Sequence, residues 1–534
     1  MISTHGNSET AADESRSDGG PSWEGASMRV PRVWRWVDSS DFRVLALFGM
    51  GAAVLHIAVN GQYGFHRDEL LTFTNARHLA WGYVSYPPIT ALLGRLELVL
   101  FGTSLAGFRF FAALSQGIAL VLTGLIAREL GGQRWAQLLA AASVAVGGHA
   151  LFSGGSHSYT TFDYVWWVLV AYFVSRFLRS DDPRWWVGIG VAIGLGMLTK
   201  YTMAFLVMGV LVGMLLTPAR RHLRSGWFWL GVATALVLML PNVVWQFQHE
   251  FASIACMRTI HERDMRWGRT DYFLLNQFWK CASPVVTPLW CAGLWYVFAT
   301  PVGKRFRMLG WMYVTPLVAF MLARGRDYYM ASAYPALLAA GAVWAEQWLT
   351  SLTPRAAAIA RGITWRTLLV AGLSTAAVTV PIAPLGSAWW RIADAVNGNF
   401  NMEIGWPELA ETVAAIRGAL PAEVQATVGI LAGDEGETGA VNLYGPHYGL
   451  PQAISGMNSN WMRGYGNPPP QTVIALGLKR DVLDRSFSSC TWAGRLTNRY
   501  GIENSTIGDY NDVFVCRDIR QPWPEFWKHF RYYG

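Results

Sequence analysis

"VLALFGMGAAVLHIAVNGQYGFHRDEL", residues 44–70, joins an apolar run to a group of charged side chains. The run near 43–60 has the length that an α-helix needs to cross a bilayer. Directly after it, the pair Asp68-Glu69 follows His66 and Arg67. The stretch therefore predicts a transmembrane helix that leads into a loop where ionisable residues gather at the membrane surface.

The same apolar pattern recurs along most of the chain. Stretches of roughly 17–22 apolar residues, the length of a membrane-spanning helix, repeat through about the first 385 positions. The chain is 52% hydrophobic and 15% charged, whereas soluble proteins average about 25% charged. A transmembrane β-barrel would instead show short alternating segments. We therefore expect a polytopic α-helical membrane protein, with no nucleic-acid partner despite a net charge of +8.

Hydropathy and loop charge together predict about eleven transmembrane helices. Three of them lie between 285 and 353, and the others lie near 43–60, 107–127, 136–153, 160–178, 186–199, 201–217, 228–247 and 367–385. Two long outer loops are expected at 61–105 and 248–285. The transmembrane domain as a whole is assigned to residues 41–385.

The loop cations predict the orientation. Residues 1–40 are polar and Gly/Ser-rich, which predicts a disordered N-terminus, and Arg29, Arg32 and Arg35 favour a cytoplasmic location for it. The other cations expected on this side are Arg128, Arg134, Arg176, Arg179, Arg220, Arg221, Arg224, Lys304, Arg305, Arg307, Arg355, Arg361 and Arg366. The predicted site and the C-terminus then lie outside the cytoplasm, in an integral protein of the plasma (inner) membrane.

From residue 386 to 534 the composition changes. Helical pieces such as "PELAETVAAIRGAL" alternate with strand-like runs such as "QTVIALGL", which predicts an extracytoplasmic α/β domain. Cys490 and Cys516 both fall in it, and a disulfide is allowed in that compartment. Spacing alone does not decide the pairing, for which Cys256 and Cys281 could compete.

Three ionisable groups near the predicted outer surface are candidates for chemistry. Asp68-Glu69 could be a solvated pair at a helix start or a catalytic pair. Asp163 lies near the outer start of the fourth span, where a carboxylate either faces a cavity or sits among headgroups. Lys200 ends an unusually short span, where it either marks a site or snorkels to the interface.

A group of outer cations breaks the positive-inside bias and needs an anionic partner: Arg258, Arg263, Arg266, Arg269, Lys280, Arg324 and Arg326. The partner could be the phosphate of a lipid-linked substrate, anionic headgroups, or local Asp and Glu residues. Carboxylates opposite cations suit group transfer from a lipid phosphate. The carboxylate would take a proton from a hydroxyl, and the cations would stabilise the departing phosphate.

Several motifs carry a resemblance to a known family. "GFHRDELLTFTNARHLAWGYVSYPPITALLGRLELVLFG" (64–102), "GLGMLTKYTM", "YYMASAYPALLAAGA" and "GETGAVNLYGPHYGLPQAISGMNSNW" (436–461) together resemble glycosyltransferase family 39. Its members are transferases of the GT-C fold that use polyprenyl- or dolichyl-phosphate sugars. One departure is Ser85-Tyr86 before Pro87-Pro88, where many relatives carry Asp-His, Asp-Gln or a Lys-containing pair.

The resemblance and the residue patterns together give three sets of candidate residues. The catalytic set, with Asp68 as the base, is Asp68, Glu69 and Asp163. The donor phosphate-binding set is Arg67, Lys200, Arg258, His261, Arg263, Tyr328 and Tyr329. The acceptor-side set is Tyr86, His157, Glu437, Tyr444 and Asn458. The alternative for Glu437, Tyr444 and Asn458 is local turn chemistry.

The resemblance implies an inverting glycosyltransferase that uses a polyprenyl-phosphate-linked sugar donor beside membrane lipid. The acceptor would be a hydroxyl on a protein, a glycan, a glycolipid or a secreted natural product. No cofactor is indicated with certainty, and a divalent metal held by Asp68 and His66 is an alternative, although their spacing matches no standard metal motif. A transporter of lipid-linked substrates and a non-catalytic glycolipid-binding protein are the other hypotheses.

Overall fold

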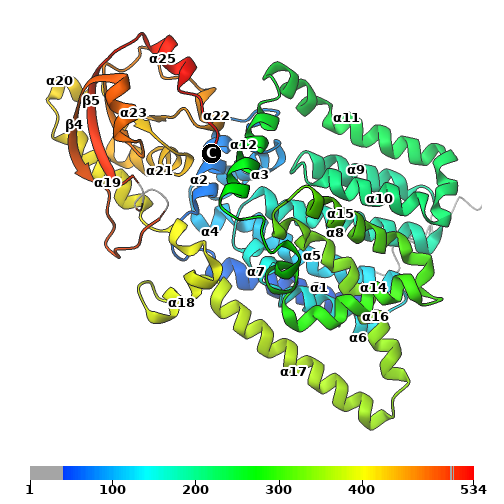
Figure 1. Ribbon diagram of the computed structural model, residues 1–534. Helices are drawn as coiled ribbons and strands as arrows, with labels where there is room; N and C mark the ends of the chain where they lie inside the picture. Colours follow the sequence, from blue (N-terminus) through cyan, green and yellow to red (C-terminus); the bar gives the residue numbers. More distant parts are fainter. Residues whose placement is uncertain (1–39, 505–507, 509) are drawn as a thin grey trace, which may run out of the picture. The chain divides into compact units, whose positions relative to one another are not determined.

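The computed structural model describes residues 40–504, 508 and 510–534 (Figure 1). The predicted disordered N-terminus, with its three arginines, therefore lies outside the described residues except for Ser40. Residues Val44–Gly534 form one compact unit. The first half of the described chain contains α1 Ser40–Val59, α2 Arg67–Arg77, α3 Ile89–Phe101, α4 Leu105–Phe108, α5 Phe110–Glu129, α6 Arg134–Ala145, α7 Gly148–Gly154, α8 Tyr159–Ser180, α9 Trp185–Met197, α10 Met203–Leu215 and α11 Gly226–Gln248.

The second half begins with further helices and ends with a mixture of helices and strands. The helices are α12 Ala252–Arg266, α13 Phe273–Asn276, α14 Thr287–Ala299, α15 Arg307–Leu322, α16 Tyr334–Thr350, α17 Pro354–Thr379, α18 Ala388–Asn397, α19 Trp406–Gly418, α20 Ala422–Gln425, α21 Glu435–Tyr444, α22 Asn458–Trp461, α23 Arg480–Ser486 and α25 Trp523–His529. The strands are β1 Gly429–Ala432, β2 Ala453–Ile454, β3 Thr472–Leu476, β4 Phe487–Arg495 and β5 Asp512–Ile519.

Helices occupy every predicted span, although many are shorter than a bilayer requires. Within the described part of the chain, three helices (α1, α5 and α11) are long and apolar enough to cross a membrane, and bent pairs raise this to as many as six. The third predicted span is one such pair, because α6 and α7 meet at 75°. The fold is therefore that of a polytopic helical membrane protein, and the number of about eleven spans remains a prediction.

The C-terminal residues build one mixed sheet. Among the described residues its strand order is β2-β1-β3-β5-β4. The first three strands are parallel to one another, and β5 runs antiparallel to β3 and β4. Cys490 on β4 lies opposite Cys516 on β5, and a disulfide joins them. The two cysteines named in the sequence analysis therefore link neighbouring strands.

The loop after α1 shares a hydrophobic core with this sheet. Phe65, Leu70 and Phe73, from α2 and the residues before it, are buried in one cluster with Trp406 of α19 and Ile474 of β3. The predicted outer loop 61–105 is therefore largely helical, and its first helix is part of the packing of the C-terminal region. This packing fixes the position of the predicted catalytic pair.

Helices α2 and α21 approach closely because α21 carries small residues at the contact. A Cβ atom on Gly439 would lie 2.5 Å from the Leu70 Cβ and also 2.5 Å from the Leu70 carbonyl oxygen. A Cβ on Gly436 would lie 2.6 Å from the Cγ of Arg67. The backbones can come this close only when side chains are absent, so the two glycines set the spacing between α21 and α2.

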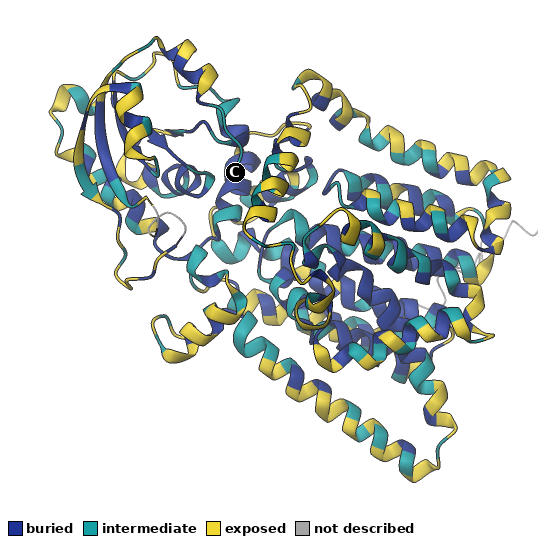
Figure 2. Ribbon diagram, viewed as in Figure 1, coloured by how far each residue is buried: buried dark blue, intermediate teal, exposed yellow. Residues whose placement is uncertain are grey.

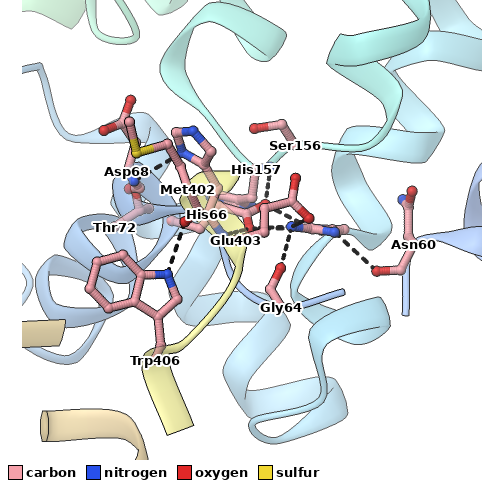
Figure 3. A network of polar contacts seen from close by, with 12 residues as sticks. Asn60, Gly64, His66, Asp68, Thr72, Ser156, His157, Met402, Glu403 and Trp406 are labelled. Atoms are coloured by element: carbon pink, nitrogen blue, oxygen red, sulfur yellow. Dashed lines mark hydrogen bonds and ion pairs between the residues drawn. The ribbon is translucent and has the colours of Figure 1, made fainter. Parts of the chain in front are cut away.

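A buried arginine ties three segments together. Arg109, between α4 and α5, has a side chain that is 1% exposed. Its Nη2 lies 2.7 Å from Glu69 Oε2 and 3.4 Å from an oxygen of Glu403, in the helical turn Phe400–Glu403. It also donates to the carbonyl oxygens of Asn60 and Gly64, and Figure 3 shows these groups converging. The end of α1, the start of α2 and the C-terminal region therefore meet at one guanidinium.

We expect Gly439→Ala to lower the thermal unfolding midpoint of the protein. The new methyl group would push α21 away from α2, and overpacking of this kind costs about 1–3 kcal/mol or more. Gly418→Ala is the matched control, because a Cβ there meets no atom within 4 Å and alanine gains about 0.5–1 kcal/mol over glycine in a helix. An equal midpoint for the two variants would contradict this interpretation of the contact.

Glu403 should make stability depend on pH. Burial, together with the nearby Glu69 carboxylate and against the charge of Arg109, raises the pKa of Glu403 from 4.5 to about 8. The folded chain then holds a proton that the unfolded chain releases, so the free energy of unfolding should fall as pH rises between these values. Thermal unfolding at pH 5.5 and pH 8.5 would measure this, and Glu403→Gln should show a smaller decrease than the wild type. Equal decreases in both proteins would exclude Glu403 as the source.

Candidate active site

The start of α2 is held by a capping box. His66 Nδ1 accepts the backbone N–H of Asp68 at 3.1 Å, and Glu69 accepts the backbone N–H of His66 at 2.8 Å. Two N–H groups that lack helical partners are satisfied in this way. The Nδ1 atom of His66 therefore accepts a hydrogen bond from the backbone of Asp68, the other residue of the hypothetical metal site.

Asp68 is the accessible member of the acid pair. Its side chain is 45% exposed and lies 3.5 Å from the half-exposed guanidinium of Arg67. In Figure 3 its carboxylate points away from the buried network. Burial raises the pKa of Asp68, but the charges of Arg67, His66 and Arg326 and a hydrogen bond from Arg67 together outweigh that effect, and the net shift is downward. Asp68 is therefore ionised at neutral pH and can accept a hydrogen bond or a proton.

Glu69 has a different role from the one predicted. Its side chain is 0% exposed, and its oxygens accept from Arg109 and from the backbone N–H groups of His66 and His157. Burial opposes ionisation, but Arg109 holds the pKa of Glu69 below its ordinary value. The prediction of Glu69 as a catalytic residue is corrected to that of a buried ion that orients α2.

Lys200 occupies an aromatic cage between α9 and α10. Its Nζ lies 4.5 Å from the ring centroid of Tyr329, 5.2 Å from that of Tyr328 and 5.3 Å from that of Tyr159. Nζ also donates to Thr160 Oγ1 at 3.3 Å. Cation–π contacts of this kind hold an ammonium in place without neutralising it. Lys200, Tyr328 and Tyr329, which the sequence assigned to one set, therefore lie together.

Asp163 lies below this cage rather than at the surface. It is buried in α8, where Thr202 donates to Oδ2 at 2.9 Å and Trp167 donates to Oδ1 at 3.1 Å. Its carboxyl group interacts electrostatically with Lys200. These contacts indicate support of the segment that carries Lys200, and the catalytic role predicted for Asp163 stays a prediction.

Only one of the three α12 residues that the sequence assigned to phosphate binding faces inward. Arg258 is 82% exposed and pairs with Glu262 one turn later, and His261 is exposed. Both lie on the solvent side of the helix, so their assignment to a phosphate pocket is corrected. Arg263 is 22% exposed, and its Nε is a buried donor that lacks a hydrogen-bond partner among the described residues.

Arg326 is a cation that the candidate set left out. It donates to both oxygens of Asp264 at 2.5 Å and 2.9 Å and to the Tyr328 hydroxyl at 3.3 Å. The sequence signal was its position at the end of the ninth predicted span, on the side where cations are unexpected. Arg109 had a similar signal, a lone charge at the start of an apolar run, but was not recognised.

Most of the acceptor-side set supports the fold. Tyr86 accepts from Asn75 Nδ2 at 2.7 Å, and His157 Nδ1 lies 2.6 Å from Glu97. Glu437 belongs to the capping box of α21, and Asn458 donates to Glu435 at 2.8 Å. All four are at most 2% exposed, and Tyr444 packs against the core shared by α2 and the sheet. Because the first four residues named here are buried, the prediction that they contact an acceptor is corrected.

The described residues contain no group of three or more His, Cys, Asp or Glu side chains arranged to hold a metal ion. The alternative of a divalent metal on Asp68 and His66 therefore gains no support from the arrangement of these side chains.

An apolar groove leads toward Lys200. It has a volume of about 240 Å³ and lies between α9, α10 and α11, with Trp186, Met197, Ala204 and Leu236 among its lining residues. From Trp186 to Met197 it extends about 16 Å along α9. The groove reaches Met197, the last residue of α9, and Lys200 lies three residues further along the chain, outside the groove's lining.

Comparison with known proteins agrees with this arrangement. Residues 85–245 match the family model described as dolichyl-phosphate-mannose-protein mannosyltransferase. The lipid A galacturonosyltransferase RgtD of Rhizobium johnstonii is 29% identical over 257 residues, which are 46% of this chain and 53% of RgtD. The match thus spans about half the length of that relative.

Two solved structures share the fold. ArnT from Cupriavidus metallidurans bound to undecaprenyl phosphate is 16% identical, with a TM-score of 0.55 over 89% of this chain and 98% of ArnT. The apo state of the same protein is 15% identical and has the same TM-score and coverage. The predicted resemblance to glycosyltransferase family 39 is therefore confirmed, and the chain shares with ArnT the GT-C fold of polytopic membrane proteins.

Proposed function

We propose that the chain is an inverting glycosyltransferase that moves a sugar from a polyprenyl-phosphate donor to a hydroxyl acceptor on the extracytoplasmic face of the plasma (inner) membrane. The observation that carries the proposal is the caged ammonium of Lys200, three residues beyond Met197, at which the apolar groove reaches the end of α9. A polyprenyl phosphate has an apolar tail and an anionic head, and the groove and Lys200 match these two parts. The solved complex of ArnT with undecaprenyl phosphate supports this choice of lipid.

The phosphate would lie against Lys200, with the hydroxyls of Tyr328 and Tyr329 beside it. Because Arg326 donates to the Tyr328 hydroxyl, that hydroxyl is free to direct its own proton toward an anion. A site that excludes water strengthens these interactions. Arg263 would add its Nε–H on the side of α12, because this group lies 3.7 Å from Asp264 without a hydrogen bond, whereas Arg326 donates to both oxygens of Asp264.

Asp68 would act as the general base. The acceptor hydroxyl would lose its proton to this carboxylate while its oxygen bonds to the anomeric carbon of the sugar. The bond from that carbon to the phosphate oxygen breaks, and polyprenyl phosphate leaves with the electron pair. One displacement from the opposite side inverts the anomeric centre. A base with a lowered pKa is adequate because a phosphate is a good leaving group and needs little help.

The acceptor class stays open among proteins, glycans, glycolipids and secreted natural products. The name of the relative RgtD favours a glycolipid. A lipid-linked-substrate transporter or a non-catalytic glycolipid-binding protein would use the same groove and the same ammonium. Only the chemistry at Asp68 separates these alternatives from an enzyme.

Asp68→Asn should therefore abolish transfer without affecting lipid binding. Removal of a general base typically costs about 100- to 10,000-fold in rate. Transfer can be followed by mass spectrometry of envelope lipids, glycans and secreted products from cells that carry either protein. Asp481→Asn, at an exposed side chain of α23 that pairs with Arg485, is the control. Wild-type product levels with Asp68→Asn would eliminate the proposed base.

Lys200→Met should weaken binding of polyprenyl phosphate by roughly 10- to 100-fold, the typical cost of losing a hydrogen bond to a charged group. Binding of undecaprenyl phosphate can be measured by native mass spectrometry of the purified protein. The control is Lys479→Met, because Lys479 also lies over an aromatic ring, that of Tyr510, but in the C-terminal region. If both variants bind as tightly as the wild type, the phosphate does not lie at Lys200.

A further inference from the structure

Helix α18, which follows the last predicted span, has an apolar face that the described residues leave uncovered. Trp389, Ile392 and Val396 are 41%, 60% and 64% exposed. Ala388 and Ala395 are exposed beside them. These positions have the spacing i, i+1, i+4, i+7 and i+8, so they form one continuous stripe along the helix. Figure 2 shows this helix as largely exposed.

The opposite side of α18 is already occupied. Trp390 and Ala393 are buried in a small cluster with Phe400, Ile404 and Ile502 of the C-terminal region. Between the two apolar sides, Asp394 accepts the backbone N–H of Asn401 at 2.9 Å, and Arg391 is exposed. The exposed stripe is therefore a second apolar face, and packing among residues 40–504, 508 and 510–534 does not explain it.

The position of α18 indicates what covers this face. Trp389 Nε1 donates to the carbonyl oxygen of Ala377, in the last turn of α17, at 2.8 Å. Tyr63, which follows α1, packs against the same cluster and donates to the carbonyl oxygen of Ala383 at 2.6 Å. The helix α18 thus lies at the level where α1 and α17 both end.

Both of those helices present apolar side chains to their surroundings. On α17, Leu369, Val370 and Leu373 are 63%, 64% and 65% exposed. On α1, Met50, Val54 and Leu55 are more than half exposed, and α1 is long and apolar enough to cross a bilayer. The stripe of α18 therefore continues a surface that faces lipid.

We propose that α18 lies along the bilayer surface, with Trp389, Ile392 and Val396 inserted among the lipids at the boundary between headgroups and acyl chains. Amphipathic helices bind such a boundary through buried apolar area and through cations that meet lipid phosphates. Trp389 suits this depth, because tryptophan is enriched at membrane interfaces. Arg391, at the edge of the stripe, would reach the headgroups.

This arrangement would set the height of the C-terminal region above the membrane. The turn Phe400–Glu403 begins three residues after α18 ends and carries Glu403 to Arg109. Lipid contact at α18 would therefore hold the element that packs against the start of α2. The inference rests on the membrane location of the chain and is independent of the proposed glycosyl transfer.

Spin labels on the full-length protein in nanodiscs that hold one copy each would test the proposal. Labels are placed at Ile392→Cys and, separately, at Val396→Cys. Arg391→Cys is the matched control on the polar side. The exposed Cys291 is replaced by Ala in every variant. Collisions with oxygen report lipid exposure, and collisions with a water-soluble nickel complex report water exposure.

We expect the ratio of oxygen to nickel accessibility to be several-fold higher at 392 and 396 than at 391. High nickel accessibility at 392 and 396 would show that the stripe faces water and would overturn the proposal. Low accessibility to both reagents at these positions would show protein contact, from a second copy or another chain, and would also overturn it. Agreement between the two labelled positions guards against a local distortion by either label.

Discussion

The charge of Arg109 is the constraint on which the site depends. A guanidinium that is 1% exposed would cost several kcal/mol if it were left unpaired in a low-dielectric interior. Its partners are Glu69 on α2, the carbonyl oxygens of Asn60 and Gly64, and Glu403 of the C-terminal region. These segments are far apart in sequence, so the charge is tolerated only when the whole arrangement has formed. The interaction fixes the direction in which α2 begins.

This direction gives two adjacent carboxylates different environments. Consecutive residues of a helix point about 100° apart. When Glu69 turns inward to Arg109, Asp68 must turn outward beside Arg67, where its side chain stays 45% exposed. The buried carboxylate holds the helix and the exposed one remains available for chemistry. A single carboxylate could not both hold the helix through Arg109 and stay accessible to solvent, so the two adjacent residues divide these roles.

Local patterns predicted the helices well, because span length and loop charge are local properties. They also brought Lys200, Tyr328 and Tyr329 together, through the order of motifs in a family. They did not reveal that Glu69 and Glu403 both contact Arg109, since these three residues lie in different elements that no local sequence pattern connects. The wrong assignment of Arg258 to phosphate binding has a similar cause. Composition shows that a cation lies on the outer loop, but only the structure shows which face of α12 carries it, and on that face it pairs with Glu262 in solvent.

The departure at Ser85-Tyr86 shows how the site accommodates an altered motif. Tyr86 is buried, accepts from Asn75 at 2.7 Å and stacks on Tyr159 with ring centroids 5.4 Å apart. Tyr159 in turn forms one wall of the Lys200 cage. At this position the chain therefore has an aromatic support that acts through a neighbouring ring. The positive charge of Lys200 comes from the link between α9 and α10, three residues beyond Met197 of the groove, rather than from the loop that carries Asp68. Asp68 and Lys200 thus belong to separate elements, and Tyr86, on the loop from α2 to α3, contacts the cage of Lys200 through Tyr159.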